Sequence, residues 1–199
     1  NVTVTFTPTA LQAYSGNITV NSNAAGGPVA LAVSGVGEVP PSANMVTVTG
    51  GTLPQGSGLA GQVVAAFRIG KYEVTWGEWK SVRDWAVTNN KGYDLAYGYG
   101  KGENFPVTDV NWYDVVKWCN ARSEMEGRIP AYYVISANKP VVYKTGQGDV
   151  NYSLVKWNAG YRLPTEAEWE KAARGGFSGR RFPRGNTINH SQANYYAYP

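Results

Sequence analysis

The sequence predicts an α+β chain in which a few β-strands precede a loop-rich domain with three helices. Apolar residues that alternate with a period of two mark the strands. Three segments that each place an acid three residues after a capping residue mark the helices. The 24 glycines among 199 residues are typical of long loops rather than of a helix bundle. A chain of this length suffices for one or two domains with a core.

Composition divides the chain into two parts. Residues 1–67 contain no Lys, Arg or Trp and a single acid, Glu38, whereas all 18 Lys and Arg and all 7 Trp lie from Arg68 onward. A shift of this size indicates two domains. We therefore expect β-strands in residues 1–38, a linker at 39–44, where Pro and Ser gather, and a second domain at 45–199.

The first part is predicted to be β-structure. Residues 2–7 and 17–21 alternate with a period of two, and residues 29–35 form a third apolar run. Ser15 and Gly16 predict a turn between the first two strands, and residues 25–28 predict the next turn. Three short strands with one apolar face do not close a sandwich. They are either part of a larger β-domain or a small hairpin that covers the following domain.

The second part opens with two strands at residues 45–52 and 63–70, and three helices follow. Each helix begins with a capping box, in which a capping side chain and an acid three residues later bond to each other's backbone N–H. The three pairs are Thr75 with Glu78, Asn111 with Asp114, and Thr165 with Glu168. Hydrophobic staples are expected between Val74 and Trp79, between Val110 and Val115, and between Pro164 and Trp169.

The second helix carries an apolar stripe and ends at Gly127; the stripe consists of Trp112, Val115, Val116 and Cys119. The third helix places Glu166, Glu168 and Glu170 near its positive end, and Lys171 and Arg174 near its negative end, before Gly175. Short strands are expected at 131–134 and 140–144. The residues interpreted as structural are Thr75, Asn111, Thr165, Glu168, Trp169 and Arg174.

Several functions are disfavoured by the residues themselves. The net charge of +4 is spread among acidic residues, which argues against nucleic-acid binding, and no apolar run is long enough for a membrane span. His190 is the sole histidine, which excludes a metal site built on several histidines within this chain. Three glutamates on one short helix cannot flank a glycosidic bond from two sides.

Two features leave alternatives open. Cys119 is either a buried core thiol or one half of a structural disulfide to a cysteine outside residues 1–199, and nothing basic lies on its face to make it a nucleophile. A second feature is a group of tyrosines that either pack in the core and loops or line a ligand groove. They are Tyr93, Tyr97, Tyr99, Tyr132 and Tyr133.

Five ordered segments carry a resemblance to a known family. They are FRIGKYEVT at 67–75, PVTDVNWYDVVKWCN at 106–120, SEMEGRIPAYY at 123–133, GYRLPTEAEWEKAARGG at 160–176 and FPRGN at 182–186. They resemble the N-terminal half of the formylglycine-generating enzyme, or sulfatase-modifying factor, family, with Arg184 where that family usually has Trp. Residues 4–37 resemble the end of the immunoglobulin-like spacer domains of bacterial surface proteins, known as choice-of-anchor or abnormal-spindle-type domains.

The resemblance implies a loop-rich, C-type-lectin-like fold for residues 45–199, after the last strands of an immunoglobulin-like sandwich. Active members of the family use copper(I), held by two cysteines, to oxidise a sulfatase cysteine with molecular oxygen. By the resemblance those cysteines lie beyond residue 199, and Cys119 corresponds to a structural cysteine. Asn194 and Tyr195 correspond to the start of a calcium site whose other ligands also lie beyond this chain.

Two functions follow as expectations. The first is a binding or structural module of a bacterial extracellular or cell-surface protein, without catalysis in these residues, whose aromatic loops contact a protein partner, a second copy or a carbohydrate. The second is a copper-dependent formylglycine-generating oxidase, or a related oxygenase, as the activity of a longer protein. The spacer-like strands favour the first function, and the family resemblance favours the second.

Overall fold

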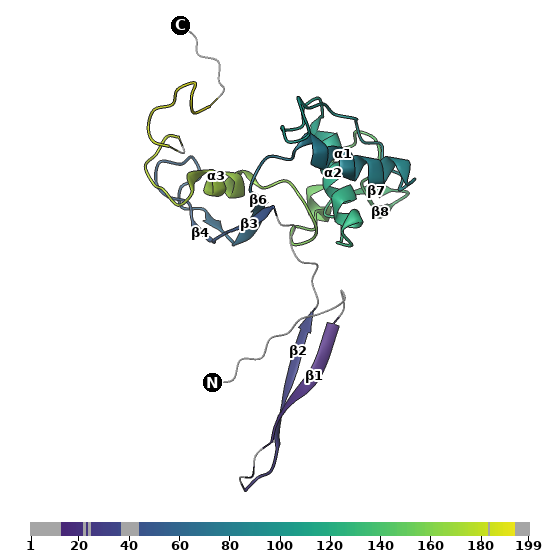
Figure 1. Cartoon of the computed structure of the whole chain (residues 1–199), viewed down its shortest axis with the longest axis vertical. Coiled ribbons are helices and arrows are strands. Elements are labelled where there is room, and N and C mark those ends of the chain that lie inside the picture. Colours follow the sequence, from purple (N-terminus) through teal and green to yellow (C-terminus); the bar gives the residue numbers. More distant parts are fainter. Residues whose placement is uncertain (1–12, 22, 24, 37–43, 183, 194–199) are drawn as a thin grey trace. The chain divides into compact units, whose positions relative to one another are not determined.

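Figure 1 shows the computed structural model of the chain, which describes residues 13–21, 23, 25–36, 44–182 and 184–193. The chain forms two compact units, Asn1–Ser42 and Ala43–Pro199. Among the described residues, none of the helices combines the length and the hydropathy that a membrane crossing requires.

The first unit contains a single described hairpin. Strand β1 (Ala13–Val20) pairs antiparallel with β2 (Val29–Val36), and Val20 lies opposite Val29. The turn predicted at residues 25–28 is confirmed, and Gly26 and Gly27 adopt the positive φ angles of +146° and +72° that it needs. The strand predicted at residues 2–7 lies outside the described residues.

The turn predicted at Ser15 and Gly16 is wrong. Both residues lie inside β1, where Ser15 pairs with Ser34 and Gly16 with Val33. A Cβ atom at Gly16 would meet nothing within 4 Å, so this glycine is not required by a turn or by a close approach. A strand tolerates an isolated glycine when its ladder continues on both sides, and the sequence signal alone does not distinguish the two cases.

The second unit begins with a ribbon of two strands, as predicted, but the ribbon is interrupted. Strand β3 (Met45–Val48) pairs with β6 (Phe67–Gly70), and β4 (Gly51–Thr52) pairs with β5 (Val63–Val64). The break falls at Gly50, where a Cβ atom would lie 2.8 Å from the backbone nitrogen of Ala66. The two backbones therefore approach too closely there for any larger residue.

Three helices and a second hairpin complete the described fold. Helices α1 (Trp76–Thr88), α2 (Trp112–Met125) and α3 (Glu166–Arg174) each carry the predicted capping box. Strands β7 (Tyr133–Ser136) and β8 (Lys139–Val142) form a hairpin close to the predicted strands, and a short 3-10 helix, η1, spans Tyr152–Leu154. Gly175 ends α3 in the left-handed conformation, with φ +55°.

The core lies between α1, α2 and the β7–β8 hairpin. The rings of Trp79 and Trp118 stack with their centroids 5.6 Å apart, and the Trp118 indole N–H donates to the carbonyl of Trp79 at 3.2 Å. Val116 and Cys119 of the predicted stripe are buried, but Trp112 is 50% exposed. Trp112 is the first residue of α2, so its side chain lies at the end of the stripe rather than within the core.

Candidate functional site

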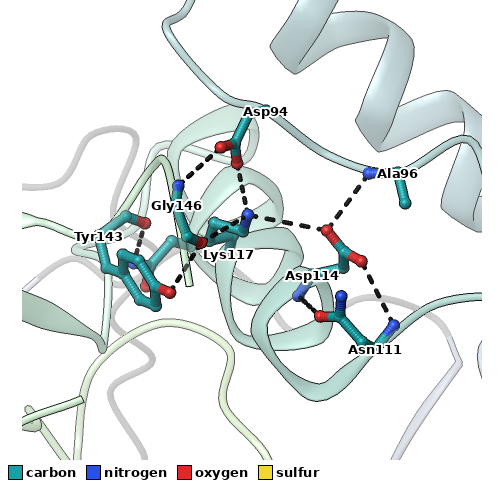
Figure 2. A network of polar contacts seen from close by, with 8 residues as sticks. Asp94, Ala96, Asn111, Asp114, Lys117, Tyr143 and Gly146 are labelled. Atoms are coloured by element: carbon teal, nitrogen blue, oxygen red, sulfur yellow. Dashed lines mark hydrogen bonds and ion pairs between the residues drawn. The ribbon is translucent and has the colours of Figure 1, made fainter. Parts of the chain in front are cut away.

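A buried lysine organises the loops around α2. The Lys117 ammonium bonds the carboxylate of Asp94, donates to the carbonyl of Gly146 at 3.1 Å, and lies 3.7 Å from an oxygen of Asp114 (Figure 2). Only 3% of the Lys117 side chain is exposed. A buried cation is tolerated when it is paired and fully hydrogen-bonded, as it is here.

This network fixes two loops by their backbones. Asp94 accepts a hydrogen bond of 2.6 Å from the N–H of Gly146, and Asp114 accepts one of 3.4 Å from the N–H of Ala96 (Figure 2). The Tyr143 hydroxyl donates to the Gly146 carbonyl at 2.9 Å. These contacts therefore attach the backbone of the loop that follows Asp94 to α2. The backbone that carries the solvent-facing side chains of this loop is fixed.

Two tyrosines of that loop lie beside the first residue of α1, and the three rings form a cluster that we call the aromatic surface: Trp76, Tyr97 and Tyr99. The ring centroid of Trp76 lies 6.2 Å from that of Tyr97 and 6.3 Å from that of Tyr99. Tyr97 is 58% exposed and Tyr99 is 54% exposed. Exposed aromatic rings that gather in this way mark interaction sites on soluble proteins more often than single exposed apolar residues do.

The backbone beneath the rings is held tightly. Tyr99 and Thr108 exchange two backbone hydrogen bonds of 2.8 and 2.7 Å, and the Trp79 indole N–H donates to the carbonyl of Ala96 at 3.1 Å. Gly100 lies directly against Trp76, because a Cβ atom at this position would come within 2.5 Å of that side chain. The backbone that carries Tyr97 and Tyr99 therefore has a fixed conformation.

Two ion pairs border the aromatic surface. Lys80 lies 4.2 Å from the centroid of the Trp76 ring and 2.8 Å from the carboxylate of Glu103. This hydrogen bond raises the pKa of Lys80 and lowers the pKa of Glu103. Arg83 lies 5.0 Å from the centroid of Tyr97 and pairs with Asp84 at 3.3 Å. Each cation thus makes a cation–π contact with a ring and also forms an ion pair with an acid.

A groove of about 650 Å³ borders the first turn of α1. Its walls come from the ends of β3 and β6, from the segment that joins β6 to α1, from the loop before α2, and from Arg122 of α2. Its lining residues are Asn44, Met45, Gly70, Tyr72, Glu73, Val74, Thr75, Glu78, Asn104, Pro106 and Arg122. Thr75 and Glu78 are also the members of the α1 capping box, so this part of the groove has a fixed shape.

The five tyrosines that the sequence singled out divide between the two alternatives. Tyr93 and Tyr132 are buried, and Tyr133 is half-buried. Burial raises the pKa of Tyr132 to about 12 and raises the pKa of Tyr93 as well. Tyr97 and Tyr99 are exposed, and only these two contribute to the aromatic surface. The interpretation as packing residues is therefore confirmed for Tyr93 and Tyr132. That Tyr97 and Tyr99 line a ligand site stays a prediction.

Comparison with known proteins decides the family. The sulfatase-modifying factor enzyme 1-like domain matches residues 33–198, which is most of the chain. The chain belongs to this family. Its mixture of helices with several small two-stranded sheets is consistent with a domain of the formylglycine-generating enzyme type.

Individual relatives cover parts of the domain. The chain is 37% identical over 137 residues to the chaperone protein LppX of Paenibacillus barcinonensis, which is 65% of this chain and 44% of that protein. It is 46% identical over 68 residues to the formylglycine-generating enzyme of Streptomyces coelicolor, which is 34% of this chain and 18% of that enzyme. The crystal structure of CarF matches with a TM-score of 0.58 at 29% identity, over 72% of this chain and 63% of that chain. The chain spans less than half the length of these two curated relatives.

The cysteine of the family domain is a core residue. Cys119 on α2 is 7% exposed, and burial raises the pKa of its thiol to about 12. A buried thiol held in its neutral form is poorly suited to act as a nucleophile or as a metal ligand. The expectation of a core thiol is confirmed, and pairing with a cysteine outside residues 1–199 stays a prediction.

The signature at residues 160–176 builds a capped helix and its anchors rather than a site. Arg162 donates two hydrogen bonds of 2.7 Å to the carboxylate of Glu168, which also completes the capping box with Thr165. Arg174 pairs with Glu170 at 2.6 Å and donates to the carbonyl of Gly56 at 3.1 Å. These contacts occupy two of the three glutamates in structural roles.

The staple expected between Pro164 and Trp169 buries little of the tryptophan. Trp169 is 62% exposed, and α3 contains no buried residue. The helix is only nine residues long, and among the described strands its main contacts are with β5. The side of α3 that carries Trp169 therefore faces solvent in the described part of the chain.

The start of the signature is anchored on α2 through Gly160. A Cβ atom there would lie 2.4 Å from the carbonyl oxygen of Ile129 and 2.4 Å from Oγ of Ser123, and φ is +39°. The next residue, Tyr161, donates its backbone N–H to Oγ of Ser123 at 2.8 Å. Only glycine fits between these groups, which explains the first residue of the signature in physical terms.

Metal sites are not evident in the described residues. No three or more His, Cys, Asp and Glu side chains gather there in a way that could hold an ion. Asn194 and Tyr195, the expected start of a calcium site, lie outside the described residues. His190 is exposed. Copper and calcium therefore remain expectations from the family resemblance.

Sequence reasoning missed the polar residues buried on α2. Asp114, Lys117, Asn120 and Ser123 follow one another at intervals of three residues, and all four are buried. Each member is a neighbour of the next on the helix surface, so the series itself could have been found. Its burial could not, because a polar stripe normally faces water, and here the partners come from distant loops.

Proposed function

We propose that this domain is a binding or structural module of a bacterial extracellular or cell-surface protein, and that residues 1–199 do not themselves catalyse oxidation. The observation that carries the proposal is the aromatic surface, because three rings gathered on α1 and on a loop with a fixed backbone are suited to contact a partner. The sole cysteine of the chain, Cys119, is buried in the core and already has a packing role.

The finer parts of the fold belong to the same proposal. The domain is C-type-lectin-like, and the β1–β2 hairpin belongs to an immunoglobulin-like sandwich. The hairpin supports this because Val20, Val29 and Leu31 are each about 60% exposed and alternate onto one face of the pair, with Val20 opposite Val29. A lone two-stranded hairpin with such a face is marginally stable in water, so we expect further strands to cover it.

The partner that we propose is another protein or a second copy of the chain. The relative from Paenibacillus barcinonensis is named a chaperone, and a chaperone contacts other proteins rather than transforming small molecules. Trp, Tyr and Arg, which form and border the aromatic surface, are the residue types most enriched at the energetic centres of protein interfaces. Carbohydrate binding is the alternative ligand class for the same rings.

The experiment that tests the function separates binding from oxidation. The full-length protein is loaded with copper(I), supplied with oxygen and mixed with a peptide that contains a sulfatase cysteine, and mass spectrometry follows that cysteine. We expect no conversion, whereas conversion at the rate of a formylglycine-generating enzyme from the same assay would overturn the proposal. That enzyme serves as the positive control.

A second function has its own support. The likeness to the formylglycine-generating enzyme of Streptomyces coelicolor favours a copper-dependent oxidase as the activity of a longer protein that contains this domain. Such a protein would supply its pair of copper-binding cysteines from outside residues 1–199, which hold only Cys119. The copper experiment decides between the two functions, because only the oxidase converts the peptide.

A further inference from the structure

The positive charge of the chain is concentrated in its last part. Residues 171–199 contain five Lys and Arg and no Asp or Glu, whereas residues 1–170 contain 13 Lys and Arg and 14 Asp and Glu. The last 29 residues therefore carry a charge of +5, and the remainder of the chain carries −1. This distribution corrects the expectation that the net charge is spread among acidic residues along the chain.

We propose that three arginines of this segment form a second binding surface, which takes a linear polymer of phosphate groups. We call this surface the arginine cluster: Arg180, Arg181 and Arg184. The inference goes beyond the proposed function, because it concerns other residues than the aromatic surface and another class of partner.

Two other cations of the segment have structural explanations and are left out of the cluster. Lys171 and Arg174 lie in the last turn of α3, where positive charge stabilises the negative end of the helix dipole. Arg174 also pairs with Glu170 at 2.6 Å and donates to the carbonyls of Gly56 and Arg180 at 3.1 and 2.9 Å. The three arginines of the cluster follow the helix and are not explained by its dipole.

The surroundings of the cluster offer little negative charge. Arg181 and Arg184 are exposed, and neither forms an ion pair with another described residue. The segment is attached to the loop between β4 and β5, since the N–H of Gly179 donates to the carbonyl of Gln55 at 3.4 Å. Residues 45–67, which include that loop, contain no charged side chain. Exposed cations without neighbouring acids attract an anionic polymer.

The backbone of the cluster forms a tight turn. Phe182 and Gly185 exchange two backbone hydrogen bonds of 2.8 and 3.1 Å. The N–H of Arg181 donates to the side-chain oxygen of Asn186 at 3.0 Å. Arg181 and Arg184 therefore belong to one short loop with a fixed backbone, so that they can contact neighbouring groups of the same polymer.

The side chains of the cluster favour phosphate groups over other partners. Arginine presents a planar fork of N–H donors that matches two oxygens of a phosphate. The guanidinium of Arg180 lies 3.6 Å from the centroid of the Phe177 ring, so one face of this ring is already covered, and Phe182 is half-buried. Single-stranded nucleic acids bind through bases that stack on free rings between cations. The cluster therefore fits a phosphate polymer without bases better than a nucleic acid.

The test measures the binding of fluorescein-labelled inorganic polyphosphate to the full chain by fluorescence anisotropy. We expect saturable binding whose affinity falls about tenfold between roughly 50 and 200 mM salt, as contacts with three phosphates imply. Oligothymidine and polyglutamate of equal charge are measured in parallel and should bind about fivefold more weakly. Absence of polyphosphate binding, or binding of either competitor with equal or higher affinity, would overturn the inference.

Paired substitutions locate the site. Arg181→Gln combined with Arg184→Gln should weaken polyphosphate binding about tenfold and reduce its dependence on salt, because two phosphate contacts are lost. The matched control combines Arg68→Gln with Lys139→Gln, which removes the same two charges from exposed positions outside the segment. The control should change binding by less than about twofold. An equal loss in both paired variants would show that net charge alone is responsible and would contradict the assignment.

A conservative pair of substitutions tests the role of the guanidinium fork. Arg181→Lys combined with Arg184→Lys keeps the charge, so the salt dependence should stay, while binding weakens about threefold because the fork is lost. Wild-type affinity in this variant would contradict the choice of phosphate geometry. Circular dichroism confirms that each variant is folded. None of the substituted residues belongs to the aromatic surface, so failure of this inference leaves the proposed function in place.

Discussion

Helices α2 and α3 begin in the same way and lie in opposite surroundings. Each opens with a capping box, Asn111 with Asp114 in α2 and Thr165 with Glu168 in α3. Yet α2 contains eight buried residues, whereas α3 contains none. The comparison shows that a cap decides where a helix starts, while contacts from distant segments decide what the helix does in the fold.

The polar groups of the two helices show the same difference. On α2, Lys117 and Asn120 bond to loops and strands that lie elsewhere in the sequence. On α3, Glu170 bonds within the helix, and Glu168 bonds to Arg162, six residues before it. Helix α2 therefore binds several distant segments, whereas the glutamates of α3 bond to nearby arginines and its Arg174 reaches a distant segment at Gly56.

The largest expected effect is at Asn120, whose side chain is fully buried. Its amide donates to the carbonyls of Tyr132 and Tyr143 at 2.8 and 3.0 Å, and its oxygen accepts the N–H groups of Ala131 and Tyr132 at 3.1 and 2.9 Å. Asn120→Ala removes a partner from each of these four backbone groups, of which the Tyr132 carbonyl keeps another donor, the N–H of Tyr143 at 3.1 Å. We expect a loss of about 3–5 kcal/mol in the free energy of unfolding.

Urea unfolding followed by tryptophan fluorescence measures this loss. The control is Asn151→Ala, which removes an exposed cap of the short η1 helix and should cost less than about 1 kcal/mol. Equal losses at the two positions would show that the surroundings of α2 are not specially sensitive to polar contacts.

The next effect is at Lys117. Lys117→Met removes the cation and leaves Asp114, which is 6% exposed, beside an apolar side chain. We expect about 2–4 kcal/mol of destabilisation, because one buried charge loses its partner. The control is Lys144→Met, which breaks a half-exposed pair with Glu124 and should cost at most about 1 kcal/mol. The same urea titration measures both variants, and a smaller loss for Lys117→Met than for the control would contradict the role of the network.

A smaller, pH-dependent effect is expected at Glu168 on α3. The hydrogen bonds from Arg162 hold the pKa of this carboxyl below its ordinary value of 4.5. Its folded pKa is lower than its unfolded pKa, so its contribution is present above about pH 4.5 and is lost as the pH falls through the folded value. Glu168→Gln should therefore cost about 1–2 kcal/mol at pH 7, and the difference from wild type should shrink below pH 4.5.

Urea unfolding midpoints of wild type and Glu168→Gln, taken between pH 7 and pH 3, measure how the difference in stability decreases. Glu166→Gln is the control, since Glu166 lies in the same first turn but is exposed. Its difference from wild type should be small at pH 7. A gap for Glu168→Gln that stays constant down to pH 3 would argue against the ion pair with Arg162.

The smallest effect is expected at Trp169. Most of this side chain is exposed, so Trp169→Ala should change the free energy of unfolding by no more than about 0.5 kcal/mol. Trp118→Ala on α2, where the ring is 3% exposed, should cost about 3–5 kcal/mol by the same measurement. A loss above 2 kcal/mol for Trp169→Ala would show that α3 is covered in solution.

Local features of the fold were predictable from the sequence. All three capping boxes, the left-handed Gly175 and the pairing of residues 45–52 with 63–70 depend on near neighbours or on alternation, which the sequence displays directly. Two predictions failed, a turn at Ser15 and a buried position for Trp112, and both depend on residues that are distant in the sequence. Whether Ser15 continues a strand and whether Trp112 is covered depend on a partner segment, which composition does not reveal.

The candidate site was predictable only in part. The tyrosines were noticed as a group, but the sequence could not say that Tyr93 is buried while Tyr97, four residues later, is exposed. That difference arises from the Asp94–Lys117 contact, which joins residues 23 positions apart and sets which side of the loop faces inward. Long-range polar contacts of this kind leave no periodic signal.

The contacts that hold the loop after Asp94 in place are made largely by its backbone. Ala96 is bound through its N–H and its carbonyl, and Tyr99 through both of its main-chain groups. Side chains at Tyr97 and Tyr99 can therefore be exchanged without dismantling the support beneath them. The support of this loop is thus separate from its exposed side chains, so substitutions at Tyr97 and Tyr99 should change the chemistry of this surface while the folding of the domain stays intact.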